Sequence, residues 1–134
     1  MEIAKIEYIG DLTTESVHLK SGIKINTDAP IDNNGKGQAF SPTDLLCASL
    51  GSCMLTIMGI VADRNNISIK GSRITISKIM ASEPRRVNEI ILEFQMPSTH
   101  FSDKEKQLLQ NAALNCPVAK SLASEIKQTV KFNY

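Results

Sequence analysis

The sequence contains no tryptophan, and aromatic residues make up only 4% of its 134 residues. Such sparse aromatics exclude the base-stacking platforms on which single-stranded nucleic-acid-binding proteins depend. The fifteen Lys and Arg residues are balanced by fourteen Asp and Glu residues, and no long run carries one sign of charge. Nothing in the charge pattern therefore favours a nucleic-acid partner or an acidic membrane surface.

Cysteine is also scarce, and its spacing is uninformative for metals. Cys47, Cys53 and Cys116 form no disulfide framework and no CxxC pair, and no His/Cys spacing is typical of zinc. We predict neither a metal nor a cofactor. The isolated histidines, His18 and His100, are expected to be surface or strand residues. The N-terminus, MEIAKIEYIG, lacks the basic start and apolar run of a signal peptide, so we expect a cytoplasmic protein with reduced thiols.

What the sequence does contain is the composition of a soluble globular protein, with 42% hydrophobic and 22% charged residues in a length that suits one domain. Alternating apolar and polar residues predict strands before a first helix and again after it. The expected strands cover residues 2–9, a hairpin turning at Ser21-Gly22, a pair at 67–82 and 85–98, and residues 127–134. Helices are expected at about 41–64, at 102–115 and from Pro117. This order predicts an α+β fold with antiparallel sheets.

A long loop is predicted at residues 29–42, APIDNNGKGQAFSP, which are rich in Gly, Asn, Asp and Pro. A loop of this length is often functional. It contains one lysine, Lys36, between two glycines. Ser41 suits the N-cap of the following helix, Pro42 its first position, and Asp44 the positive end of the helix dipole.

The first predicted helix has an unusual composition, because residues 45–62 carry no charge. Eighteen residues are at the margin of a membrane span. Cys, Ser, Thr and Gly dilute the segment, so we favour a helix buried on every side. One small chain does not easily cover a helix all round, and Ala48, Gly51 and Ser52 leave room for a second helix. We therefore expect a homodimer, with a monomer whose helix is mostly covered as the alternative.

Two of the three cysteines are predicted to lie in different chemical surroundings. Cys53 lies in the middle of the long helix, where a cysteine is typically a small buried apolar residue. Cys116 immediately precedes Pro117, at a helix start whose unpaired backbone N–H groups favour a thiolate. On these grounds alone, Cys116 is predicted to be the more acidic thiol, and no role is assigned to it.

The segments SPTDLLCASLGSCM and NCPVAKSL, whose Cys53 and Cys116 are 63 residues apart, resemble the paired cysteine motifs of the OsmC/Ohr family. These are the osmotically inducible and organic hydroperoxide resistance proteins. The resemblance covers nearly the whole chain in element order and is to the divergent, OsmC-like branch. It implies a single OsmC-like domain over residues 1–134, in an intertwined homodimer with antiparallel sheets around a long buried central helix.

The resemblance also implies a chemistry for the two thiols. Cys53 matches the peroxidatic cysteine of the family and would become a sulfenic acid on attacking hydrogen peroxide or an organic hydroperoxide. Cys116 matches the resolving cysteine and would form a disulfide with Cys53, which a dithiol reductant would reopen. Cys47 is six residues before Cys53, about 240° round the helix, and is expected to serve in packing.

Peroxidases of this family supply an arginine from the N-terminal part of the chain and a carboxylate near the start of the central helix. The present sequence has no arginine before Arg64. Lys36 is the best-placed upstream cation, although a lysine lacks the two-pronged geometry of arginine. Arg85 and Arg86 are expected to lie in a solvated turn and could alternatively reach across a dimer. Asp44 occupies the carboxylate region.

Two other functions stay open on the sequence alone. The same fold could be a module that binds a small apolar molecule between central helices, with the cysteines lining the pocket. It could also be a stress-related dimer whose cysteines only pack. A cation within a few ångströms of Cys53 and two thiols within disulfide reach are expected only of the peroxidase.

Overall fold

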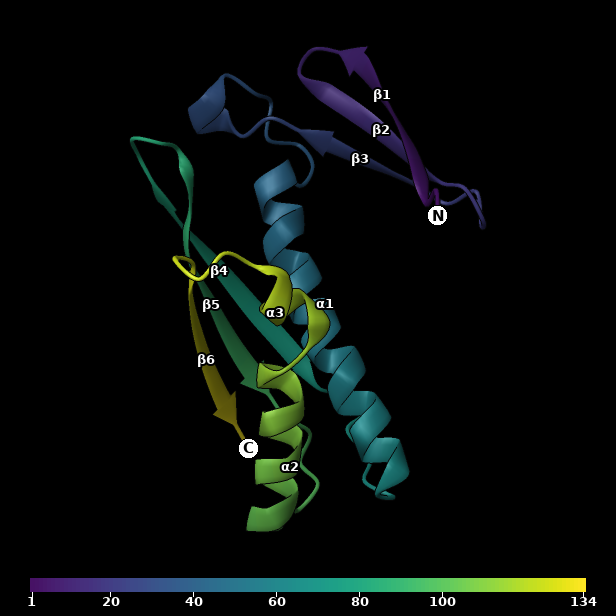
Figure 1. The fold of residues 1–134 in the computed structure, drawn as a ribbon, viewed down its shortest axis with the longest axis vertical. Helices are drawn as coiled ribbons and strands as arrows, with labels where there is room; N and C mark the ends of the chain where they lie inside the picture. Colours follow the sequence, from purple (N-terminus) through teal and green to yellow (C-terminus); the bar gives the residue numbers. More distant parts are fainter. The chain divides into compact units, whose positions relative to one another are not determined.

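The computed structural model describes residues 1–134, which divide into two compact units, Met1–Leu46 and Cys47–Tyr134 (Figure 1). The long helix α1, Pro42–Arg64, begins in the first unit and continues through the second. The α+β class predicted from the sequence is confirmed. The single domain expected over residues 1–134 stays a prediction.

The first unit contains an antiparallel sheet of three strands in the order β1-β2-β3. The strands are β1 (Ala4–Gly10), β2 (Thr13–His18) and β3 (Lys24–Asp28). Asp11 and Leu12, between β1 and β2, both have positive φ angles, as hairpin turns matching the twist of a sheet require. The predicted long loop follows β3 and contains only one short 3-10 turn, η1 (Ile31–Asn33).

This sheet has one apolar face, and that face is exposed. Ile6, Ser16 and Ile25 are directly paired across the three strands, so their side chains share a face. Tyr8 lies two residues after Ile6 and therefore shares it too. Ile6 is 69% exposed, Tyr8 64% and Ile25 49%. The opposite face is polar and includes an ion pair between Lys24 and Glu15 at 3.3 Å. The alternation predicted from the sequence is present, but its apolar half lacks cover within the chain.

A reciprocal pair of hydrogen bonds starts α1. The Asp44 backbone N–H donates to the Ser41 Oγ at 3.0 Å, and the Ser41 N–H donates to the Asp44 Oδ2 at 2.9 Å. Such a capping box satisfies two of the N–H groups that every helix start leaves unpaired. Pro42 occupies the first helical position, where its missing N–H costs nothing. The helix ends at Arg64, and Asn66 follows in the left-handed region.

The second unit contains β4 (Arg73–Ala81), β5 (Arg86–Gln95) and β6 (Lys127–Asn133), in the order β4-β5-β6. β4 and β5 are antiparallel, but β6 runs parallel to β5. The prediction of antiparallel sheets is therefore corrected for this pair. The helices between β5 and β6 provide the long crossover that a parallel pair requires.

The predicted strand 67–82 also starts later than expected. Residues before β4 form a turn, with Gly71 at a positive φ and the Ser72 N–H bonded to the Ile69 carbonyl. A turn at this point satisfies backbone groups that a longer strand would have left unpaired at the end of the sheet.

Two further helices connect β5 to β6, α2 (Asp103–Leu114) and α3 (Pro117–Ser121). Ser102 and Glu105 form the predicted capping box of α2. α1, α2 and α3 cover one face of the sheet, and the core is formed by apolar residues between these layers (Figure 1). Its fully buried members include Met54, Met58, Leu92 and Phe94.

The single chain covers only one side of α1, and its burial on every side in a homodimer stays a prediction. Its buried residues form one stripe at helical spacing, comprising Cys47, Leu50, Gly51, Met54, Met58 and Ala62. Leu46 and Ile60 are exposed. Gly51 faces the chain's own sheet, because a Cβ at this position would lie 2.6 Å from Ile76 Cδ1. Of the three small residues expected to admit a second helix, Ser52 is exposed and Ala48 half-buried.

α1 is also long and apolar enough to cross a membrane, with a mean hydropathy of 2.1 in its most apolar window. Core helices of soluble proteins meet the same criterion, and the buried stripe of α1 contributes to the core. We therefore interpret α1 as a core helix.

Candidate functional site

Two cysteines far apart in the sequence meet in the second unit. Cys53 lies in the middle of α1, and Cys116 is the N-cap of α3, which lies beside α1 (Figure 1). The two thiols are close enough to interact, because Cys53 contributes to raising the pKa of the Cys116 thiol. Neither is part of a disulfide.

The two thiols differ in exposure. Cys116 is fully buried, with 0% of its surface exposed. Cys53 is only half-buried and packs at the border of the core. Its helix neighbours Ser49, Ser52 and Thr56 are exposed. A molecule that approaches this pair from outside the unit therefore reaches Cys53 first.

The backbone of α3 contacts the Cys116 sulfur, as the sequence predicted. Pro117 occupies the first helical position, and the Ala119 N–H donates a hydrogen bond to the Cys116 Sγ at 3.4 Å. Sequence reasoning anticipated such N–H groups but could not identify Ala119. The geometry follows from the N-cap position, in which a side chain accepts from the third residue of the helix.

The predicted acidity of Cys116 is wrong, however. Burial raises the pKa of the Cys116 thiol above its ordinary value of 9.0, and the hydrogen bond and charge interaction with Cys53 raise it further. The N–H groups of Ala119 and Val118 lower it, but their effect is smaller than that of burial. A thiolate loses more by leaving water than two weak N–H···S contacts return. The Cys116 thiol is therefore harder to ionise than an ordinary cysteine thiol.

The third cysteine, Cys47, lies in the hydrophobic core. Cys47 is 2% exposed and belongs to the buried stripe of α1 with Leu50 and Met54. The sequence predicted that it points away from Cys53 and serves in packing. Its burial in the core is consistent with that role.

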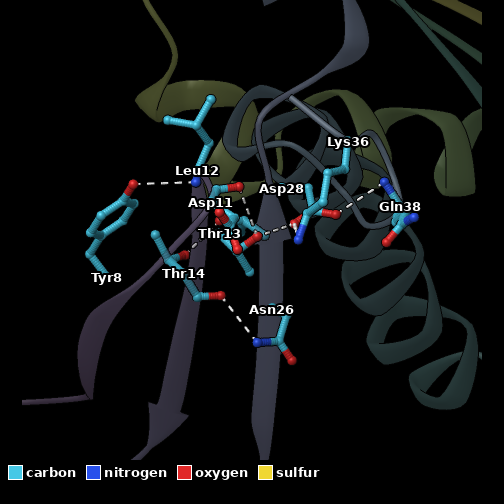
Figure 2. Close-up of polar contacts among 10 residues, drawn as sticks. Tyr8, Asp11, Leu12, Thr13, Thr14, Asn26, Asp28, Lys36 and Gln38 are labelled. Carbon is cyan, nitrogen blue, oxygen red and sulfur yellow. Dashed lines mark hydrogen bonds and ion pairs between the residues drawn. The ribbon is translucent and has the colours of Figure 1, made fainter. Parts of the chain in front are cut away.

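The other two predicted site residues, Lys36 and Asp44, belong to the first unit. Lys36 lies 3.8 Å from Asp28, a buried carboxylate at the end of β3 (Figure 2). Asp28 also accepts hydrogen bonds from the Thr13 hydroxyl at 2.5 Å and from the Gln38 N–H at 3.1 Å. The pKa of the Asp28 carboxyl is lowered, mainly by the Thr13 hydrogen bond. This cluster attaches the loop that carries Lys36 to the sheet.

Asp28 was missed by the sequence reasoning, since an aspartate at the end of a strand gives no signal that distinguishes it from a turn residue. Asp44 was expected to cap α1 or to supply a catalytic carboxylate. The structure shows the capping role, in the reciprocal bonds with Ser41. Of the turn arginines, Arg86 donates to the Val87 carbonyl and to Asn88.

Comparison with known proteins places this arrangement in context. The family model described as OsmC-like protein matches residues 35–131. No curated protein matches the chain. Among solved structures, a Psychrobacter arcticus 273-4 protein described provisionally as an osmotic stress induced and detoxification response protein has a TM-score of 0.95 and 48% identity. That match covers 99% of the present chain and 96% of the other.

More distant structures share the fold. An organic hydroperoxide resistance protein OsmC from Legionella pneumophila has a TM-score of 0.79 at 17% identity, covering 100% of this chain and 97% of that one. The organic hydroperoxide resistance protein OhrB of Bacillus subtilis has a TM-score of 0.69 at 20% identity, covering 97% of each chain. The family match extends over both cysteines and most of the chain, and the chain therefore belongs to the OsmC-like protein family.

Proposed function

We propose that this soluble OsmC-like protein is a thiol-dependent peroxidase that reduces hydrogen peroxide or organic hydroperoxides. The observation that carries the proposal is the interaction between Cys53 and Cys116, two residues 63 positions apart in the sequence. Two proteins of the same fold are named for resistance to organic hydroperoxides, which supports the choice of substrate class.

The first step is attack of the Cys53 thiolate on a peroxide oxygen. The O–O bond breaks, Cys53 becomes a sulfenic acid, and the second oxygen leaves as water or an alcohol after taking up a proton. Cys53 has this role because it is the more exposed thiol of the pair. Cys116 is its interacting neighbour and is therefore in a position to attack the oxidised sulfur.

The second step forms a disulfide between the two residues. The Cys116 sulfur attacks the Cys53 sulfenic acid, and the hydroxyl leaves as water with the Cys116 proton. A dithiol then restores both thiols and becomes a disulfide itself. Each turnover thus converts one peroxide and one dithiol into an alcohol or water, one water and one oxidised dithiol.

We further propose that the protein acts as a cytoplasmic homodimer. The apolar sheet face with Ile6, Tyr8 and Ile25 is exposed in the chain, as are Leu46 and Ile60 of the uncharged stretch of α1, residues 45–62. Large apolar side chains that lie together on one exposed face often mark an interaction site. A second copy of the chain would cover it. A reducing compartment is consistent with three free thiols.

Lys36 and Asp44 stay candidates for the cation and the carboxylate of the reaction. Each already has a structural partner, Asp28 for Lys36 and Ser41 for Asp44. Their catalytic roles are therefore to be tested by kinetics rather than assumed from position.

The proposal is tested by the intact mass of the reduced protein after one equivalent of cumene hydroperoxide or hydrogen peroxide. We expect a rapid loss of about two mass units, mapped by peptide analysis to a Cys53–Cys116 bond with Cys47 still free. Cys53→Ser should abolish the change, and Cys116→Ser should leave an oxygen adduct on Cys53. An unchanged mass after minutes would reject the peroxidase and favour the module that binds an apolar molecule.

A further inference from the structure

We infer that the reductant attacks the Cys53 sulfur of the Cys53–Cys116 disulfide and expels the Cys116 thiolate, so that the mixed disulfide forms on Cys53. The inference deepens the proposed function, because it concerns the disulfide that the proposed reaction would form. It selects one of two sulfurs that thiol–disulfide chemistry alone treats as equivalent.

Access distinguishes the two sulfurs. The Cys116 side chain has 0% of its surface exposed, and the core residues around it, including Leu109, Ala113 and Ala119, are buried as well. The Cys116 side chain is thus closed from solvent in the folded chain. Assembly with another chain can only add cover. Cys53 is half-buried, beside the exposed Ser52 and Thr56.

The direction of attack leads to the same conclusion. A thiolate attacks a disulfide in line with the S–S bond, from the side opposite the leaving sulfur. For attack on Cys53, the attacking thiol must reach a half-buried sulfur at the border of the core. For attack on Cys116, it must reach a sulfur that is closed from solvent. A reductant thiol therefore reaches the Cys53 sulfur more easily.

The Ala119 N–H would assist the departure of the Cys116 sulfur, whereas burial, which raises the pKa of its thiol, opposes it. The Ala119 N–H donates to the Cys116 Sγ at 3.4 Å and would stabilise the charge that develops as the S–S bond breaks. Burial then raises the pKa of the released thiol, which favours its protonation. A protonated Cys116 does not attack the mixed disulfide again, so the adduct on Cys53 persists.

The electron balance of the complete step requires a dithiol. One thiolate of the dithiol bonds to the Cys53 sulfur and the bond to Cys116 breaks. The second thiolate of the dithiol then attacks its own sulfur in the mixed disulfide, and the Cys53 thiolate leaves. The dithiol is oxidised to a disulfide, and both protein cysteines are reduced and take up the two protons released.

The experiment uses the full chain carrying Cys47→Ala, so that only two thiols remain. Diamide closes the disulfide without any peroxide, which separates this test from the peroxidase proposal. 2-Mercaptoethanol is then added briefly, free thiols are blocked with N-ethylmaleimide at acid quench, and both cysteine peptides are quantified. We expect the 2-mercaptoethanol adduct on Cys53 and the maleimide on Cys116, in about tenfold or greater excess over the reverse.

The matched control repeats the reaction on the same disulfide protein unfolded in urea, where burial no longer distinguishes the sulfurs. There the excess should fall to nearly equal labelling. A second measurement compares the reduced variants Cys47→Ala/Cys116→Ser and Cys47→Ala/Cys53→Ser, of which the first should react about tenfold faster with a disulfide reagent such as 5,5′-dithiobis(2-nitrobenzoate).

An adduct mainly on Cys116, or equal labelling in the folded protein, would overturn the inference. Disulfide formation by diamide but not by peroxide would reject the peroxidase while leaving the choice of sulfur to be decided by the same data. Failure of diamide to close the disulfide would overturn both proposals, since each requires the two sulfurs to bond.

Discussion

Gly51 of α1 lies so close to Ile76 of β4 that a Cβ atom on Gly51 would stand 2.6 Å from the Ile76 Cδ1 atom. This glycine, which the sequence suggested as a contact for a second helix, instead brings α1 onto its own sheet. Gly59, two turns further along α1, has nothing within 4 Å of the same hypothetical Cβ. Gly59 is thus a control position for Gly51, because both lie in α1 and only Gly51 has a close neighbour.

Alanine at these two positions should have different effects on stability. Gly59→Ala should raise the free energy of unfolding by about 0.5–1 kcal/mol, because alanine is the better helix former. Gly51→Ala should raise the free energy of unfolding by less than this, or lower it, because the Ile76 side chain must move to admit the new Cβ. Gly51→Leu should cost about 1–3 kcal/mol by overpacking. Urea denaturation of the three variants measures this, and an equal gain for both alanines would contradict the described contact.

Cys47→Ala should separate packing from chemistry. The residue is 2% exposed in the core stripe of α1, so its truncation should cost about 1–2 kcal/mol of unfolding free energy. The yield of the Cys53–Cys116 disulfide after peroxide should be unchanged. Denaturation and intact-mass analysis of one preparation provide both readouts. A lost disulfide in a folded variant would show that Cys47 takes part in the reaction.

Lys36→Met tests whether the loop lysine assists the reaction. The ion pair of Lys36 with Asp28 is long, and the Lys36 side chain is about half exposed. We therefore expect the free energy of unfolding to fall by no more than about 1 kcal/mol. If Lys36 supplies the cation for the peroxide, the second-order rate of Cys53 oxidation should fall by about tenfold or more. Lys24→Met, which breaks the Glu15 ion pair on the same unit, is the control and should retain the rate. Equal rates in both variants would remove Lys36 from the site.

Stability at acid pH should depend on Asp28. The pKa of its carboxyl is below the ordinary value of 3.8, so folding favours the ionised form. The resulting stabilisation is fully present above the unfolded-state pKa and is lost as the pH falls through the lower folded-state value. Asp28→Asn should therefore lower the melting temperature at pH 7 and flatten its decline below about pH 4. The exposed Asp11→Asn is the control, and an unaltered acid profile in Asp28→Asn would contradict the cluster.

A charged substitution on the apolar sheet face should dissociate the proposed dimer. Ile6→Glu places a charge on the exposed apolar face, where a second chain would have to bury it at a high cost. Lys5→Glu changes the neighbouring residue on the opposite face and should leave the assembly intact. Analytical ultracentrifugation should give twice the chain mass of 14.7 kDa for the wild type and Lys5→Glu, and the chain mass for Ile6→Glu. A monomeric wild type would reject the dimer.

Local signals in the sequence were sufficient for most of the elements. The alternation of apolar residues predicted β1, β5 and β6, and the Ser102 capping box predicted the start of α2. The start of α1 at Pro42 and its end at Arg64 followed from Ser41 and from the asparagines after it. These features depend on residues within one turn or one strand, so the sequence contains them directly.

The sequence-based predictions failed for features that depend on residues far apart in the chain. The parallel pairing of β6 with β5 depends on how the α2–α3 connection returns the chain, which periodicity does not reveal. The pKa of Cys116 was predicted from its helix start, whereas its burial by other elements raises it. Asp28 became recognisable only when the structure joined it to Thr13 and Lys36.

By itself, the sequence determined the element order, the capping of the helices, the uncharged stretch 45–62 and the two cysteine motifs, because each is encoded by neighbouring residues. Only the tertiary structure decided that Cys53 and Cys116 interact, that Cys116 is closed from solvent while Cys53 is half-buried, and which face of α1 its own sheet covers. The physical reason is the same in each case. Burial and contact are properties of segments that lie far apart along the chain and meet only when it folds.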